Sequence, residues 1–153
     1  MGIRSHLLMA AVALTATFGV AAGSANAALD PKALTQVPFD QYKFEGKPGG
    51  PQQVKVYGDP DKPGPYGILI RWLPHTNSRP HLHHNDRYIV VLQGVWWVNT
   101  GPKFNAATMV PIKPGVMVTH HKDEIHYDGA KDEGALIWIT GMGPATSVDK
   151  EQK

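Results

Sequence analysis

The chain has 153 residues, with 15 Lys and Arg, 13 Asp and Glu, eight His and no Cys. This length leaves room for about one domain, and a hydrophobic fraction of 42% with 18% charged residues is typical of a globular protein. A formal net charge of +2 is too small to indicate nucleic-acid binding, and the lack of Cys excludes disulfides and zinc–thiolate sites.

Residues 1–27 have the pattern of a cleaved signal peptide. Arg4 supplies a positive charge, residues 7–20 are apolar, and Ala25-Asn26-Ala27 has the small-x-small form of a cleavage site. A membrane anchor is the weaker alternative, because the apolar run is shorter than the roughly 18–20 residues that span a bilayer. We therefore expect a periplasmic or secreted protein that has no membrane contact once the signal is removed. A cysteine-free chain suits the oxidising periplasm.

The mature chain divides into an N-terminal arm (28–50), a single domain (51–146) and a polar tail (147–153) that we expect to be flexible. In the domain, Gly and Pro fall between short β-branched runs, as turns do between strands. The predicted strands are 53–57, 67–73, 95–99, 108–111, 116–120, 124–127 and 135–140, together with an extended stretch over 79–92. Since no window has a helical period, this pattern predicts an all-β sandwich or barrel.

Histidines carry the functional signal, because seven of the eight lie between positions 75 and 126. His81 and His83 are two residues apart on a predicted strand, so their side chains point to the same face. Two such imidazoles can bind a divalent transition metal such as Fe, Mn, Ni, Cu or Zn. His126, on a later strand, is the candidate third ligand, whereas His84 should point away and His120 is expected at the surface.

The segment HLHHNDR (81–87), followed by YIVVLQ and Gly94, resembles the first cupin motif. That motif has two His as HxH, a Glu four residues on and a Gly seven further. The spacing is kept, but Arg87 stands at the position of the Glu and His75 at that of the opening Gly.

The segment from Gly115 to His126 resembles the second cupin motif, in which Gly, five residues, Pro-x-Gly and two residues precede a His. His121 and Asp123 stand in place of its Pro and Gly. The resemblance covers residues 67–143 and is greatest to small secreted single-domain cupins of the RmlC-like superfamily. It implies a single-domain antiparallel cupin barrel (a double-stranded β-helix, or jelly roll) with an interior metal site and a small-molecule ligand or substrate.

A homodimer is also implied, because cupins often dimerise through their sheets. Trp96 and Trp97 are adjacent on a predicted strand, so they must face opposite sides of it. One should fill the core, while an outward Trp marks a candidate subunit interface.

The two functional hypotheses differ in the role that they give to Arg87. It keeps the parity of His81 and His83, so we predict that its side chain enters the same cavity. Arginine cannot ligate a metal, but beside a neutral three-histidine site it can clamp a substrate carboxylate or enolate with two donors. Cupin dioxygenases that lack the Glu resemble this arrangement. The first hypothesis is therefore a dioxygenase-like metal enzyme that acts on a small carboxylate or enolisable carbonyl, with Arg87 as a catalytic residue.

The second hypothesis treats Arg87 as structural. A cation that faces a metal ion is electrostatically unfavourable, so Arg87 could instead pair with a nearby acid and hold strands together. The candidate acids are Asp86, Asp123, Glu124 and Asp128. The metal would then bind weakly or not at all, and the protein would be a non-catalytic small-ligand-binding or sensing cupin.

Overall fold

The computed structural model describes residues 29–153, so the predicted signal peptide lies outside the described residues. In this part of the chain no helix is both long and apolar enough to cross a bilayer. The chain divides into two units at residue 36. In the first unit, residues 31–33 form a turn, in which the Asp30 carbonyl accepts hydrogen bonds from the N–H groups of Ala33 and Leu34.

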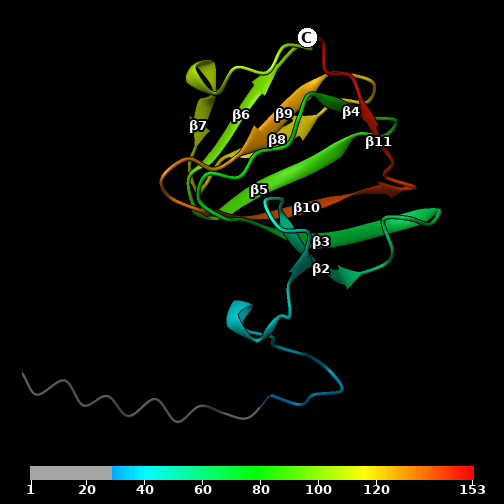
Figure 1. Cartoon of the computed structure of the whole chain (residues 1–153). Coiled ribbons are helices and arrows are strands. Elements are labelled where there is room, and N and C mark those ends of the chain that lie inside the picture. The colour runs from blue at the N-terminus through cyan, green and yellow to red at the C-terminus, as the bar shows by residue number, and fades with distance from the viewer. Residues whose placement is uncertain (1–28) are drawn as a thin grey trace, which may run out of the picture. The chain divides into compact units, whose positions relative to one another are not determined.

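The second unit, residues 37–153, consists of two antiparallel sheets (Figure 1). One sheet has the strand order β1 (Glu45–Gly46), β2 (Gln52–Tyr57), β3 (Gly64–Trp72), β10 (Ala135–Gly143), β5 (Arg87–Gly94) and β8 (Met117–His120). The other has the order β11 (Ser147–Asp149), β4 (His81–His83), β9 (His126–Gly129), β6 (Trp96–Thr100) and β7 (Val110–Ile112). Of two short 3-10 helices, η1 (Phe39–Gln41) precedes β1 and η2 (Ala106–Thr108) lies between β6 and β7. The predicted all-β antiparallel fold is confirmed.

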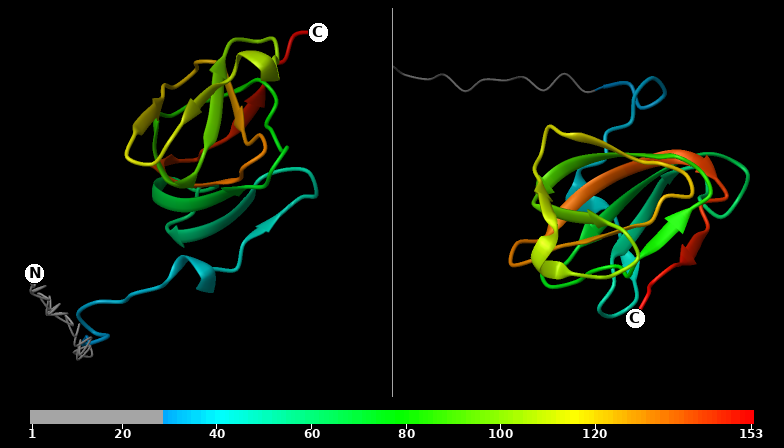
Figure 2. Two further views of the ribbon diagram at one scale, coloured as in Figure 1. Left: turned by 90° about the vertical axis from the view of Figure 1, so that its left-hand side faces the viewer. Right: turned by 90° about the horizontal axis from the view of Figure 1, so that it is seen from above.

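The core lies between the two sheets. In Figure 1 strands β3 and β10 lie below β4, β6 and β9, and the left view of Figure 2 shows this arrangement from the side. The core follows from side-chain alternation, because residues two apart on a strand share a face. On β3 the inward series begins at Tyr66 and ends at Trp72, and Ile137 and Ile139 on the neighbouring β10 continue the same layer. From the facing sheet Trp96 of β6 joins this layer and is fully buried.

The chain passes from one sheet to the other at residues 84–86. Strand β4 ends at His83 in the sheet that holds β9, whereas β5 begins at Arg87 in the sheet that holds β10. The predicted single extended stretch over 79–92 is therefore wrong, because a bend divides it into two strands of different sheets. Since the sheets face each other, side chains at this junction meet in the interior.

Gly94 makes the turn between β5 and β6 with a φ of 71°. A Cβ at this position would lie 1.9 Å from the carbonyl oxygen of Gly134. Both the left-handed backbone and the close approach require glycine, which explains physically why a glycine stands at this position of the cupin-like motif.

The tail over 147–153, which is predicted to be flexible, begins with a strand. Ser147–Asp149 forms β11, which pairs with β4 so that Ser147 lies opposite His83 and Asp149 opposite His81. Beyond β11, the Lys150 N–H donates to the Pro80 carbonyl over 2.9 Å and the Gln152 N–H to the Pro102 carbonyl over 2.8 Å. A polar, exposed segment can be held by backbone hydrogen bonds, which side-chain composition does not reveal.

Within the predicted N-terminal arm, residues 37–50 contain η1 and β1, and the rest of this stretch is irregular. Strand β1 pairs with β2, with Glu45 opposite Gln53. The Arg71 guanidinium lies 3.8 Å from the centroid of the Phe44 ring, which adds a cation–π contact to this edge of the sheet.

Trp96 and Trp97 face opposite sides of β6, as alternation predicts. Trp96 points inward and is buried, whereas Trp97 is half-buried and has the Lys131 ammonium 3.7 Å above its ring. Lys131 therefore covers part of the apolar surface that Trp97 would offer to a second subunit. The homodimer stays a prediction.

Replacing Ile137 with Ala tests the position of the core. Ile137 of β10 is fully buried, so Ile137→Ala should lower the free energy of unfolding by about 2–5 kcal/mol, measured by urea denaturation. The matched control is Val110→Ala on strand β7, because Val110 is 54% exposed; its effect should stay within about 0.5 kcal/mol. Equal losses in the two variants would contradict the described core.

Candidate metal centre

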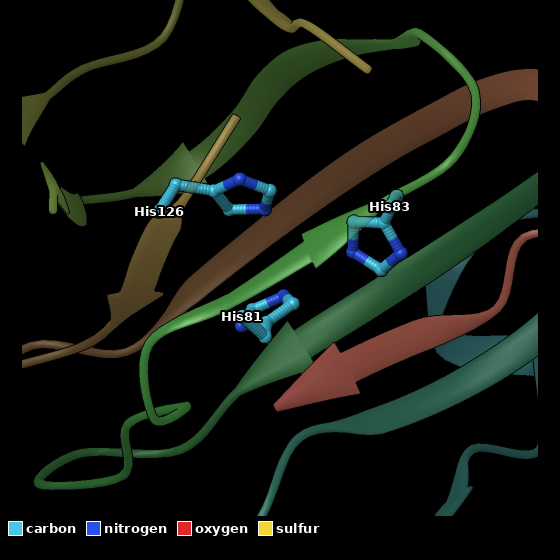
Figure 3. A group of neighbouring side chains, drawn as sticks. All are labelled: His81, His83 and His126. Atoms are coloured by element: carbon cyan, nitrogen blue, oxygen red, sulfur yellow. The ribbon is translucent and has the colours of Figure 1, made fainter. Parts of the chain in front are cut away.

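Three imidazoles lie side by side on the adjacent strands β4 and β9. His81 is directly opposite His126 across the strand pair, and His83 is two residues further along β4. The ring centroid of His81 lies 4.9 Å from that of His83 and 4.6 Å from that of His126. One nitrogen from each ring lies within 4.8 Å of the other two. Figure 3 shows the two rings of β4 with the His126 ring beside them on the neighbouring strand. The structure thus brings together the three predicted ligand residues.

Each of the three rings is oriented by a backbone carbonyl. The Nδ1 atoms of His81, His83 and His126 are hydrogen-bonded to the carbonyl oxygens of Arg79 (2.7 Å), Thr146 (3.0 Å) and Glu124 (3.0 Å), respectively. Because a carbonyl oxygen only accepts, the proton must be on Nδ1 in each ring. The lone pair is therefore on Nε2 in all three, which is the tautomer that a metal ligand of this kind needs.

The donor set fits a divalent transition metal. His126 Nε2 is buried and, among the described residues, has no hydrogen-bond partner. A buried acceptor without a donor is costly, and a metal ion at the three Nε2 atoms would satisfy it. Three neutral imidazoles suit Fe, Mn, Ni, Cu or Zn and do not discriminate between them.

A cavity of about 640 Å³ adjoins the centre, and His81 and His83 contribute to its wall. Its other lining residues include an apolar group (Ile68, Ile70, Trp72) and a polar group (Tyr66, Arg87, Asp128). The volume is in the range of small-molecule sites, and an apolar wall with a few polar groups is their usual lining. A small ligand in this cavity would therefore contact both the histidines and Arg87.

Arg87 reaches this cavity from β5, in the opposite sheet to His81 and His83. It is buried, and its Nη1 donates to His83 Nε2. Its Nε is buried without a hydrogen-bond partner among the described residues. One of the three Nε2 lone pairs is thus engaged by a guanidinium.

None of the four acids proposed as structural partners binds Arg87 in the part of the chain that the structure describes. The Asp86 carboxylate accepts from the backbone N–H of Lys122, and that of Asp123 is bonded to His84. The Asp128 carboxylate accepts from Ser78 and Trp96, whereas Glu124 meets the site only through its backbone carbonyl. The ion-paired arrangement that the structural hypothesis requires is therefore not present.

His120 is the residue that sequence reasoning placed wrongly. It was expected at the surface, yet it is buried at the end of β8, with its ring centroid 3.7 Å from that of His126 and 5.5 Å from that of Trp96. This ring contact limits the orientations that the His126 side chain can adopt. The available signal was alternation, because Val118, two residues earlier, packs against the core.

Asp128 is a second residue of the site whose role the sequence did not indicate. It lies two residues after His126 on β9, so both side chains point to the same face. One carboxylate oxygen accepts from Ser78 Oγ over 2.7 Å and the other from Trp96 Nε1 over 3.1 Å. Ser78 and Trp96 thus hold the buried Asp128 carboxylate near His126, and this carboxylate does not form an ion pair with Arg87.

Burial favours the neutral form of His83, His120 and His126. It lowers the pKa of His83 to about 3, and the charges of Arg87 and His81 act in the same direction. Burial is also the largest cause that lowers the pKa of His126, where the Asp128 carboxylate opposes it. The pKa of His120 is lowered by burial and then by His126. Neutral imidazoles are the form that binds metals.

Acid should therefore destabilise the metal-free protein. The unfolded chain takes up protons on these histidines as the pH falls through about 6.5, whereas the folded chain does not, so the stability present above that pH is lost on acidification. Each histidine should contribute a slope of about 1.4 kcal/mol per pH unit between about pH 6.5 and 4. Urea denaturation with a chelator present measures the slope.

The matched pair for this measurement is His120→Gln and His75→Gln. His120→Gln should reduce the slope of the free energy of unfolding against pH by about the contribution of one histidine. His75→Gln should leave this slope unchanged, because His75 lies on an exposed turn. Stability that does not vary with pH over this range would show that the buried imidazoles are not held neutral.

Comparison with solved structures identifies the architecture. The polyketide cyclase RemF from Streptomyces resistomycificus superposes with a TM-score of 0.64 at 16% identity, over 78% of this chain and 87% of that chain. A conserved protein with a double-stranded β-helix domain from Klebsiella pneumoniae gives a TM-score of 0.58 at 17% identity, over 76% and 97%. The DMSP lyase DddQ from Ruegeria pomeroyi gives 0.54 at 13% identity, over 66% and 53%.

No family model matches the sequence, and no curated protein matches it. The identities to the solved structures are low, so these likenesses establish the fold. Cupin-like and cupin-2 domain proteins are among the similar structures. The chain therefore has the cupin fold, the double-stranded β-helix that the HxH segment and the Gly115–His126 segment predicted.

Proposed function

We propose that the protein is a metal-dependent enzyme, similar to the cupin dioxygenases, that acts on a small carboxylate or an enolisable carbonyl compound. The observation that carries this proposal is the orientation of three Nδ1–H groups by backbone carbonyls. It leaves the lone pair of each ring on Nε2, in a group whose ring nitrogens come within 4.8 Å of one another beside a cavity. A fold alone does not imply an activity. Neighbouring neutral imidazoles with this tautomer are suited to metal ligation.

His81, His83 and His126 would hold the divalent ion. Because all three ligands are neutral, the ion keeps its full charge and open coordination positions, and it would supply Lewis-acid or redox activation of a bound substrate. Ile68, Ile70 and Trp72 exclude water from the substrate's apolar body. Arg87 binds and orients its carboxylate or enolate oxygen, for which a planar guanidinium with several donors is suited.

The named neighbours support an enzymatic role for this fold. The cyclase RemF and the lyase DddQ are enzymes that have similar barrels. Dioxygenase chemistry is proposed because the HxH segment with its Glu replaced resembles the cupin dioxygenases that lack this Glu, not because of these two neighbours. A non-catalytic ligand-binding role is the alternative, and the contact of Arg87 with His83 Nε2 favours it if the metal cannot displace the guanidinium.

The test is turnover by purified protein from which any affinity tag has been removed. Reconstitution with Fe²⁺, Mn²⁺, Ni²⁺, Cu²⁺ and Zn²⁺ should give close to one bound ion per chain for at least one metal, measured by elemental analysis. Oxygen consumption with a panel of diketones and aromatic acids should depend on that metal. His81→Ala, which removes one ligand, should lower the rate by at least about a hundredfold.

The matched control is His84→Ala, on the exposed side of the same segment, where the ring binds Asp123 instead of facing the centre. This variant should keep the metal content and the rate. Fewer than about 0.1 ions per chain with every metal would contradict the proposal. Stoichiometric metal and ligand binding without turnover would leave the non-catalytic role.

We also propose that the protein is exported. The support is the charged start, the apolar run and the Ala25-Asn26-Ala27 site. Expression of the full chain in a Gram-negative host should give a periplasmic product that begins at Ala28, as read by mass spectrometry. Replacement of both Ala25 and Ala27 by Leu should leave the precursor uncleaved, because the cleavage site requires small residues. A cytoplasmic product that begins at Met1 would contradict export.

A further inference from the structure

Arg87 and a metal ion would compete for the same atom. Arg87 Nη1 donates to His83 Nε2, whose Nδ1 is already bonded to the Thr146 carbonyl. An imidazole nitrogen has a single lone pair, so His83 Nε2 cannot accept from Arg87 and ligate a metal at the same time. Metal binding at the three histidines therefore requires Arg87 to give up this hydrogen bond.

If Arg87 gives up its hydrogen bond to His83, its guanidinium stays buried and has no carboxylate partner among the described residues. Arg87 is 9% exposed, and no carboxylate of the described residues lies within ion-pair distance of it. Its Nε already has no hydrogen-bond partner there. An unpaired buried charge is strongly unfavourable, and a nearby divalent cation adds repulsion. An anion in the cavity would relieve both costs.

The structure supplies a second donor beside Arg87. Tyr66 of β3 and Arg87 of β5 are both the register neighbours of Gly141 on the strand between them, β10. A Cβ on Gly141 would lie 3.2 Å from the Tyr66 hydroxyl oxygen, so the missing side chain leaves room for the phenol between the two outer strands. Tyr66 and Arg87 both line the cavity, and Tyr66 Oη is buried without a partner among the described residues.

Tyr66 is suited to donate to an anion because it remains protonated. Burial raises the pKa of its phenol, and the neighbouring Arg87 opposes this shift only in part. The wall next to this donor pair is apolar, with Ile68 and Ile70 following Tyr66 along the same face of β3. The ligand that this end of the cavity fits is a small organic anion with a carboxylate or enolate oxygen and an apolar body.

We propose that Arg87 couples metal binding at the three histidines to the binding of a small organic anion, by exchanging its hydrogen bond to His83 for one to the anion, with Tyr66 as the second donor. This inference rests on the proposed function, since it assumes the metal site. The anion then tightens the binding of the metal, and the metal tightens the binding of the anion by the same factor, because coupling between binding sites is reciprocal.

The first experiment uses the mature wild-type protein with Zn²⁺, benzoate as the anion and neutral benzamide as the matched probe. Zn²⁺ affinity is measured by competition with a chromophoric chelator. Saturating benzoate should tighten Zn²⁺ binding by about tenfold, within the usual range of coupling between sites, and benzamide should not. The benzoate affinity, measured by calorimetry, should rise by the same factor when Zn²⁺ is present.

The second experiment assigns the coupling to the two donors. Arg87→Met removes the competitor for His83 Nε2, so it should bind Zn²⁺ more tightly than the wild type without benzoate and lose the benzoate effect. Tyr66→Phe should show a smaller benzoate effect than the wild type, because it lacks the second donor. The control is Arg71→Met, which removes a charge that lies over Phe44 instead of in the cavity; it should behave as the wild type.

The outcomes separate this inference from the proposed function. Zn²⁺ binding that is equal with and without benzoate in the wild type would overturn the coupling and leave the metal site intact. So would a benzoate effect that survives in Arg87→Met. If that variant does not fold, Arg87→Lys replaces it: it keeps the charge but lacks the planar donors, so the benzoate effect should fall to under about threefold. No Zn²⁺ binding by either the wild type or Arg87→Met would overturn the proposed function as well.

Discussion

The arrangement of the site depends on one buried positive charge that has no carboxylate partner in the described chain. Arg87 lies among the imidazoles of His83, His120 and His126, and its charge helps to lower the pKa of all three. A protonated histidine here would add a second cation to a poorly solvated space, so the rings stay neutral. Their neutral state in turn leaves their lone pairs available for ligation. The same charge that excludes protons would also repel a metal ion, and a bound anion would offset this repulsion.

Backbone carbonyls, rather than acidic side chains, orient the three candidate ligands. An acid bonded to Nδ1–H would have introduced negative charge and raised the pKa of the ring, whereas a carbonyl fixes the tautomer without adding a charge. The carbonyl that binds His83 belongs to Thr146, immediately before β11, and the one that binds His81 belongs to Arg79. Arg79 is in turn held by Glu151 and by the ring of Phe104, 4.2 Å away. The geometry of the ligand strand thus depends on the last residues of the chain.

Alternation along strands was enough to predict much of this molecule. It placed His81 and His83 on one face and gave most strands to within a few residues, and the motif spacing brought His126 to them. Arg87 lies in the cavity as predicted, but the reasoning was incomplete. It treated residues 81–87 as one strand with alternating side chains, whereas the chain changes sheets at 84–86 and Arg87 enters the cavity from the opposite sheet. The bend depends on how two sheets pack, which a local pattern does not encode. Strand β11 and the contact of His83 with the Thr146 carbonyl were not predictable, because hydrogen bonds to the backbone of a distant segment leave no trace in side-chain type. His120 was predictable from Val118 but was misjudged, since a histidine next to His121 and Lys122 has the composition of a surface loop.

The exchange of a carboxylate for a guanidinium at position 87 changes the charge of the site by two units relative to the cupin motif that it resembles. A Glu ligand would lower the net charge of a bound divalent ion by one, whereas Arg87 raises the local charge by one. Such a centre is poorly suited to hold an ion alone and well suited to hold one together with an anionic substrate. Arg87 and Tyr66 both line a cavity of about 640 Å³, and each has a buried polar atom without a hydrogen-bond partner among the described residues. In a folded protein a buried donor is left open chiefly where a ligand or water completes it. Substrate charge, rather than any additional protein ligand, would then complete this metal centre.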